Sequence, residues 1–168
     1  MPVTQWLQEQ LQSSARGFIG AVEQLPTDHL FLPPPRPNWL GEWCAGRHVF
    51  HMLYYEQNKA LPFVRQCVGL APANEPYDDD EQRAWQKQDQ DVGSMLATFQ
   101  QARNELITSL AAFTEEEWDA PREEEPWGTI TLRWIITKAY QHTCEHTHDV
   151  LQLVLFWDFA AYQETTRL

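Results

Sequence analysis

The sequence is poor in basic residues and contains no long apolar run. Its 12 Lys and Arg residues stand against 24 Asp and Glu residues, which gives a formal net charge of −12. Nucleic-acid affinity rests on clustered Lys and Arg, so this balance argues against a nucleic-acid-binding surface and, for the same reason, against an anionic membrane surface. No stretch approaches the roughly 18 apolar residues of a membrane span, and we expect no membrane partner.

Cysteine is also scarce. Cys44, Cys67 and Cys144 are odd in number, lie far apart, and form no Cys-x-x-Cys pair. This pattern indicates neither a disulfide framework nor a zinc knuckle. The first residues show no basic region followed by an apolar run, so we expect no secretory signal. A reducing, cytoplasmic setting follows as the expectation.

Bulky apolar residues, in contrast, are plentiful. The chain has 168 residues, is 43% hydrophobic, and contains eight Trp and eight Phe. That is enough for one ordinary domain with its own core. We predict a single domain over 1–168, with a core of about 3–155 and an aromatic C-terminal extension over 156–168. The extension would lengthen the last helix, cover an open end of the bundle or form a subunit contact, and it is compatible with a homodimer.

Apolar residues recur at steps of three and four along several segments, which predicts amphipathic helices. The first would end at Pro26, the second would start near Trp43 and be kinked or ended by Pro62, and the third would open on the acids at 78–81. The fourth carries its apolar stripe from Leu132 to Leu153. With almost no strand-like alternation, the predicted fold is all-α: a four-helix bundle with long crossover connections.

The connections are also visible in the sequence. Residues 26–41 contain five prolines and must be extended, and residues 69–80 form another predicted loop. Thr114-Glu115-Glu116-Glu117 has the spacing of a capping box and predicts a short helical turn. The segment 121–129, with two prolines and a Glu triplet, is a predicted loop before the fourth helix.

Two histidines interrupt the apolar stripe of the fourth helix. His142 and His146 are four residues apart, so they point the same way about one turn apart. A buried imidazole without a partner would cost roughly 1–3 kcal/mol, so the pair needs an explanation. One explanation is a hydrogen bond for each ring, and the other is a shared metal ion.

A third imidazole from another helix would complete a metal site with open coordination positions, as in catalytic zinc sites. His51 is our candidate because it lies on the second helix, and His48 is the alternative because it shares roughly the same face. His29 and His148 fit exposed or locally bonded positions better. Zinc and nickel are the expected metals, since imidazole suits both.

The ordered set of motifs resembles the DinB-like superfamily of metal-dependent four-helix-bundle proteins over roughly residues 5–155. The resemblance rests on Trp43 opening the second helix, His51 about two turns later, and the pair His142 and His146 in the fourth helix. It implies a three-histidine site for a divalent metal at His51, His142 and His146. Cys44 and Gly46 depart from the family pattern, and a Gly so early in a helix costs about 1 kcal/mol and loosens its start.

The resemblance also implies a chemistry, because thiol-dependent S-transferases and mycothiol-dependent maleylpyruvate isomerases share this bundle. The expected function is thus a metal-dependent enzyme that joins a low-molecular-weight thiol to a small electrophile. Hydrolysis by a metal-activated water is the other reaction that such a site allows. A non-catalytic metal-binding bundle with a structural or partner-binding role is the alternative, and its site would be closed by a fourth ligand, with His48 the candidate.

The carboxylates, arginines and cysteines near the predicted site have less specific expected roles. Glu56 and Glu145 are expected to be solvated or to support a ligand, and no residue stands out as a general base. Arg47 and Arg103 are expected in ion pairs, with a role in holding a substrate carboxylate as the alternative. Cys44 and Cys144 are expected to serve as small hydrophobic residues, with a redox or metal role as the alternative for Cys144.

Overall fold

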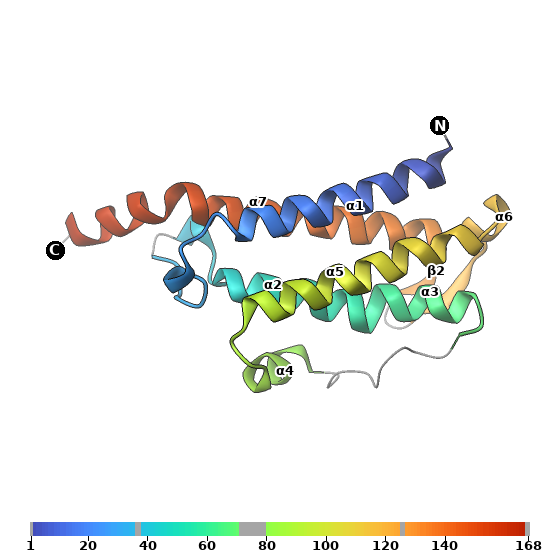
Figure 1. Ribbon diagram of the computed structural model, residues 1–168, viewed down its shortest axis with the longest axis horizontal. Helices are drawn as coiled ribbons and strands as arrows, with labels where there is room; N and C mark the ends of the chain where they lie inside the picture. Colours follow the sequence, from blue (N-terminus) through green and yellow to red (C-terminus); the bar gives the residue numbers. More distant parts are fainter. Residues whose placement is uncertain (1, 36–37, 71–79, 125–126, 167–168) are drawn as a thin grey trace.

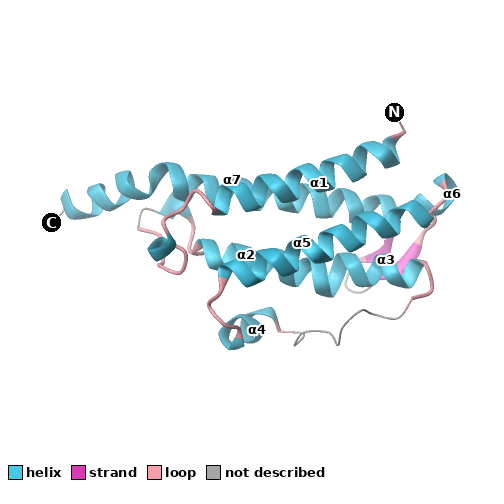
Figure 2. Cartoon of the chain, in the orientation of Figure 1, coloured by secondary structure: helices cyan, strands magenta, loops and turns pink. Residues whose placement is uncertain are grey.

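The chain folds into a bundle of four long helical segments that run side by side (Figure 1). The computed structural model describes residues 2–35, 38–70, 80–124 and 127–166. The long segments are α1 (Val3–Val22), the run from α2 (Ala45–Tyr55) to α3 (Leu61–Cys67), α5 (Val92–Ser109) and α7 (Leu132–Thr166). Helices dominate the chain, with one small sheet (Figure 2). The all-α four-helix-bundle prediction is confirmed.

The core forms because each long helix buries the apolar face that its sequence predicts. In α1, buried side chains recur every three or four residues from Leu7 through Phe18 to Val22, and this face packs along α7. Helix α5 packs along α2 and α1. The pairing of α1 with α7 and of α2 with α5 brings α2 and α7 to the same interior, where the histidines lie.

The second predicted helix does not end at Pro62, but its turns change from α-helical to π-helical just before this residue. A π-helical segment, η3 (Glu56–Ala60), connects α2 to α3, and Pro62 occupies the first turn of α3. A proline ring clashes with the carbonyl four residues before it in a regular α-helix, and the wider π-turn lies where that clash would occur. One consequence is that Glu56, the first residue of η3, is fully buried.

The predicted third helix is two helices. Helix α4 (Glu81–Lys87) begins after Asp80, whose carboxylate accepts a hydrogen bond from the Arg83 backbone at 3.1 Å. Helix α5 begins after Asp91, which accepts from the Ser94 backbone at 3.0 Å. Two separate N-caps therefore divide the segment. The acids at 78–79 and most of the predicted loop 69–80 lie outside the described residues.

The segment before α7 contains a hairpin that the sequence analysis missed. The capping box is present as predicted, with Thr114 and Glu117 bonded reciprocally at the start of α6 (Glu115–Trp118). Strand β1 (Arg122–Glu124) then pairs antiparallel with β2 (Gly128–Ile130). The predicted loop is thus wrong here, because strands of three residues are too short to show an alternating pattern.

The proline-rich segment before α2 contains two short 3-10 turns, η1 (Thr27–His29) and η2 (Asn38–Leu40). The end of α7 packs against them: the ring of Trp157 stacks on His29 at 4.4 Å, and Phe156 meets Trp39 edge to face at 5.2 Å between centroids. The aromatic extension therefore lengthens the fourth helix and also covers this end of the bundle.

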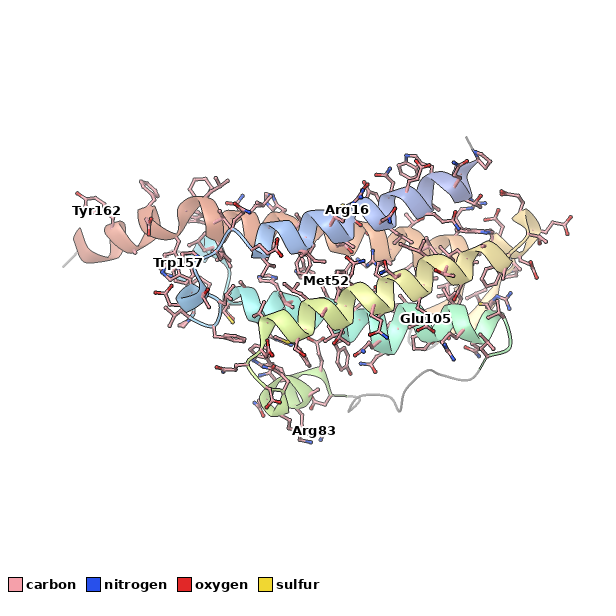
Figure 3. All side chains as sticks on the ribbon, in the orientation of Figure 1. Arg16, Met52, Arg83, Glu105, Trp157 and Tyr162 are labelled. Carbon is pink, nitrogen blue, oxygen red and sulfur yellow. The ribbon has the colours of Figure 1, made fainter. Side chains whose placement is uncertain are left out.

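Beyond these contacts α7 projects past the bundle, and Tyr162 points away from it (Figure 3). Leu155 and Phe159, in the same part of α7, are also exposed. None of the helices in the described ranges is both long enough and apolar enough to cross a membrane.

Candidate metal centre

Three histidine side chains converge between α2 and α7. The Nε2 atom of His142 lies 2.9 Å from Nε2 of His51 and 3.1 Å from Nε2 of His146. His142 and His146 meet because they are one turn apart on α7, and His51 reaches them because α2 packs against that face. The structure thus brings together the three residues that the sequence analysis named as metal ligands.

A carboxylate supports the ligand contributed by α2. The Nδ1 atom of His51 lies 2.9 Å from Oε1 and 3.0 Å from Oε2 of Glu81, and Arg47 donates to Oε1 at 2.6 Å. Burial raises the pKa of Glu81, but the hydrogen bonds from His51 and Arg47 outweigh it and leave the pKa below its ordinary value. This carboxylate fixes the ring orientation and directs Nε2 of His51 into the cluster.

Burial favours the neutral form of His142 and His146, the two imidazoles that α7 contributes to the cluster. Burial, together with the neighbouring histidines, lowers the pKa of His142 to about 3. Burial and the proximity of His51 lower the pKa of His146 to about 4. Neutral imidazole is the form that binds a metal, so both rings carry lone pairs for coordination at pH 7.

The donor set fits a divalent cation. A ring nitrogen carries one proton or one lone pair, so Nε2 of His142 cannot satisfy both neighbouring nitrogens by hydrogen bonding. Its Nδ1 is buried and has no hydrogen-bond partner. The separations of 2.9 and 3.1 Å are short enough for all these nitrogens to lie about 2.1 Å from one ion. Three converging Nε2 atoms are therefore a site that a cation would satisfy.

His48, the alternative third ligand, lies on the other side of His146. Its Nδ1 is 2.9 Å from Nδ1 of His146, so it faces the nitrogen that points away from the three-histidine cluster. Asp149 approaches the same Nδ1, with its Oδ2 at 3.3 Å. In this geometry His48 approaches the opposite nitrogen of His146 and not the three converging Nε2 atoms.

A buried ion pair underlies the cluster. Arg103 and Glu56 are both inaccessible to solvent and pair through two hydrogen bonds of 2.7 and 3.0 Å. The Arg103 guanidinium also donates to Oγ1 of Thr143 at 3.0 Å, next in sequence to His142. Arg103 lies among the buried residues of α5 and ties the π-helical segment and α5 to α7 through these contacts. The expectation that Arg103 forms an ion pair is confirmed.

Trp43 covers the cluster from the N-terminal end of α2. Its ring is nearly parallel to that of His146, with 5.9 Å between centroids, and it meets His51 edge to face at 5.0 Å. The Arg47 guanidinium lies over the indole, with its Cζ atom 4.7 Å from the ring centroid, a cation–π contact. The aromatic residue that the family pattern places before the first ligand therefore packs against two histidines of the cluster.

A pocket of about 520 Å³ opens beside the cluster. This volume is in the range of small-molecule sites. It is lined by Trp39, Leu40, Gly41, Glu42, Trp43, His48, His146, Asp149 and Gln152. Because His146 belongs both to the pocket wall and to the three-histidine cluster, a molecule in the pocket would lie next to the ligands.

Gly46 has a packing role at the start of α2. Its backbone N–H donates to the Leu30 carbonyl at 2.7 Å, and a Cβ atom at this position would lie 2.5 Å from Cε1 of Phe31. Only glycine allows the connection before α2 to approach this closely. This close approach gives a reason for the glycine that departs from the family pattern.

The remaining candidates lie outside the cluster. Glu145 is exposed and pairs with Gln141 and Lys138, while Cys144 is exposed and Cys44 is buried at the start of α2. His148 is exposed, as expected.

Glu81 and Asp149 are the polar residues that sequence reasoning missed. Their spacing from the histidines gave a signal only for Asp149, which lies three residues after His146 and hence on a neighbouring position of one helix face.

The family model of the DinB superfamily matches residues 10–150, most of the chain, and the protein belongs to that superfamily. The match includes all the residues of the histidine cluster. A search of the curated proteins finds no match. The fold, the family and the cluster together describe a helical protein with a histidine site that fits a metal ion.

Proposed function

We propose that the protein is a metal-dependent enzyme that acts on a small molecule, and more narrowly a transferase that joins a low-molecular-weight thiol to an electrophile. The observation that carries the proposal is the convergence of three imidazole Nε2 atoms beside a pocket of about 520 Å³. His51, His142 and His146 would hold the ion, and zinc or nickel suits such a set. A bound ion would lower the pKa of a thiol or a water molecule that it holds.

The resemblance to thiol-dependent transferases favours thiol transfer over hydrolysis. Two carboxylates near the cluster are engaged in ion pairs, because Glu56 is paired with Arg103 and Glu81 is held by His51 and Arg47. The carboxylates that line the pocket are Glu42 and Asp149. A thiolate held by the ion would itself be the nucleophile.

The pocket wall suits a small electrophile with an apolar part. Trp39 and Trp43 give flat apolar surfaces to this wall, and the Trp43 ring lies nearly parallel to that of His146. A closed, purely structural site would need a fourth protein ligand on the cluster. His48 lies against the opposite nitrogen of His146, which favours the enzyme over the non-catalytic bundle.

Element-resolved metal analysis of protein purified without a His tag tests the first part of the proposal. We expect about one zinc or nickel per chain in the wild type and loss of it in His142→Ala and His51→Ala, with retention in the control His148→Gln. No metal in the wild type after soaking with Zn²⁺ and Ni²⁺ would overturn the proposal.

The reaction is tested on the metal-loaded protein. Cysteine and glutathione are offered as thiols, together with a chromogenic aryl chloride as the electrophile. We expect thiol consumption that is lost in His142→Ala and kept in His148→Gln. A protein that binds metal but releases only hydrolysis products from ester substrates would contradict thiol transfer while leaving the metal site intact.

A further inference from the structure

A second group of ligand atoms lies on the far side of His146. Its Nδ1 is 2.9 Å from Nδ1 of His48 and 3.3 Å from Oδ2 of Asp149, and the last two atoms are 4.0 Å apart. The three residues come from α2 and from one turn of α7. The group is separate from the three-histidine cluster except for His146, whose two ring nitrogens face the two groups.

A proton and a cation are alternative occupants of this second group. When Nε2 of His146 offers its lone pair to the first cluster, Nδ1 carries the single ring proton and donates it to Nδ1 of His48, while the half-exposed Asp149 carboxylate faces solvent. A cation that displaces this proton to solvent, and so leaves an imidazolate, would use all three atoms.

The distances and chemistry fit such a cation. Two nitrogens and one carboxylate oxygen are a donor set that zinc uses, with each ligand about 2.0–2.2 Å from the ion. Ligand atoms around one ion are then separated by at most about 4.2 Å, and the three separations of 2.9, 3.3 and 4.0 Å meet that limit. We propose that His48, His146 and Asp149 form a second divalent-cation site, which shares the His146 imidazole with the three-histidine site.

The second site would open directly onto the pocket. His48, His146 and Asp149 all line it, together with Glu42. Two carboxylates give this pocket a negative charge, whereas an ion on the second site would offer a positive centre and free positions to a substrate. The ligand class is therefore a small molecule with an anionic or carbonyl oxygen, held near the thiol. The inference builds on the proposed three-histidine site but requires no catalytic activity.

Calorimetric titration of metal-free, untagged protein with Zn²⁺ tests the second site. We expect two ions per chain in the wild type and one in His48→Gln and in Asp149→Asn. The matched controls are His148→Gln and Asp158→Asn, which remove the same groups from exposed positions of α7, and both should keep two ions. Asp149 is half exposed, so its variant should fold even if the His48 variant does not.

Loading with Cu²⁺ tests the sharing of His146. Two copper ions joined by one imidazolate couple their spins, so the paramagnetic resonance signal per copper should fall when the second equivalent binds. Asp149→Asn should instead show the signal of one isolated ion.

Saturation of the wild type at one ion overturns the second site alone. Two ions in both His48→Gln and Asp149→Asn also overturn it, and a wild type that binds none overturns both metal sites.

Discussion

Glu81 and His51 are joined by a hydrogen bond of 2.9 Å although they lie on different helices, α4 and α2. The carboxylate holds Nδ1 of His51 and so directs Nε2 into the cluster. We expect Glu81→Gln to fold and to bind Zn²⁺ about 10–100-fold more weakly, the usual effect of removing such a supporting group. Competition with a chromophoric chelator measures the affinity. Glu145→Gln, which removes an exposed carboxylate beside His146, is the control, and equal affinities in the two variants would contradict the role of Glu81.

The buried pair of Arg103 and Glu56 predicts a strong asymmetry between single and double substitution. Arg103→Met leaves a fully buried carboxylate without its partner, and we expect a loss of about 3–5 kcal/mol in the free energy of unfolding. Glu56→Leu combined with Arg103→Met should recover much of that loss. Urea unfolding measures all the variants. A double variant as unstable as the sum of the two single ones would show that the pair is not coupled.

Gly46 and Gly17 give a matched pair of Gly→Ala substitutions in two helices. Gly46→Ala would place a Cβ atom 2.5 Å from Phe31, so we expect a destabilisation of about 1–3 kcal/mol from overpacking. Gly17 in α1 has nothing within 4 Å of such a Cβ, and its replacement should stabilise the protein by about 0.5–1 kcal/mol. Thermal unfolding followed by circular dichroism compares them. A neutral Gly46→Ala would mean that the segment at Phe31 moves aside freely.

The neutral histidines predict that the metal-free protein loses stability in mild acid. Burial lowers the pKa of His48 and of His142 to about 3 and that of His146 to about 4, against about 6.5 in an unfolded chain. Below pH 6.5 the unfolded chain therefore binds more protons than the folded one, and the free energy of unfolding falls as the pH falls.

Each of the three histidines adds up to about 1.4 kcal/mol per pH unit to this slope. Urea unfolding at steps from pH 7 to pH 5.5, above the range where most carboxylates titrate, measures it. His142→Gln removes one of these groups and should give a shallower slope, while His148→Gln should not change it. Identical slopes in the wild type and His142→Gln would contradict the prediction.

Most of the helical bundle could be predicted from the sequence because its signals are local and repeated. The apolar steps of α1 and α7 extend over many turns, and the capping box at Thr114 and Glu117 depends on residues three apart. The hairpin of β1 and β2 was missed because its strands are too short to carry a pattern. The separation of α4 from α5 was missed because a second N-cap at Asp91 interrupts what looked like one continuous helix.

For the site, the sequence by itself singled out His142 and His146, because they interrupt an apolar stripe, and the family resemblance predicted His51 from its spacing after Trp43. Which nitrogen of each ring faces which neighbour was decided only by the packing of α2 against α7. That packing turned His48 toward the opposite side of His146. The contact of α4 with α2 brought in Glu81, and the packing of α5 placed the buried Arg103 next to Thr143. Spacing along one helix fixes a shared face, whereas contacts between helices depend on the crossing and rotation of both, which no local pattern encodes.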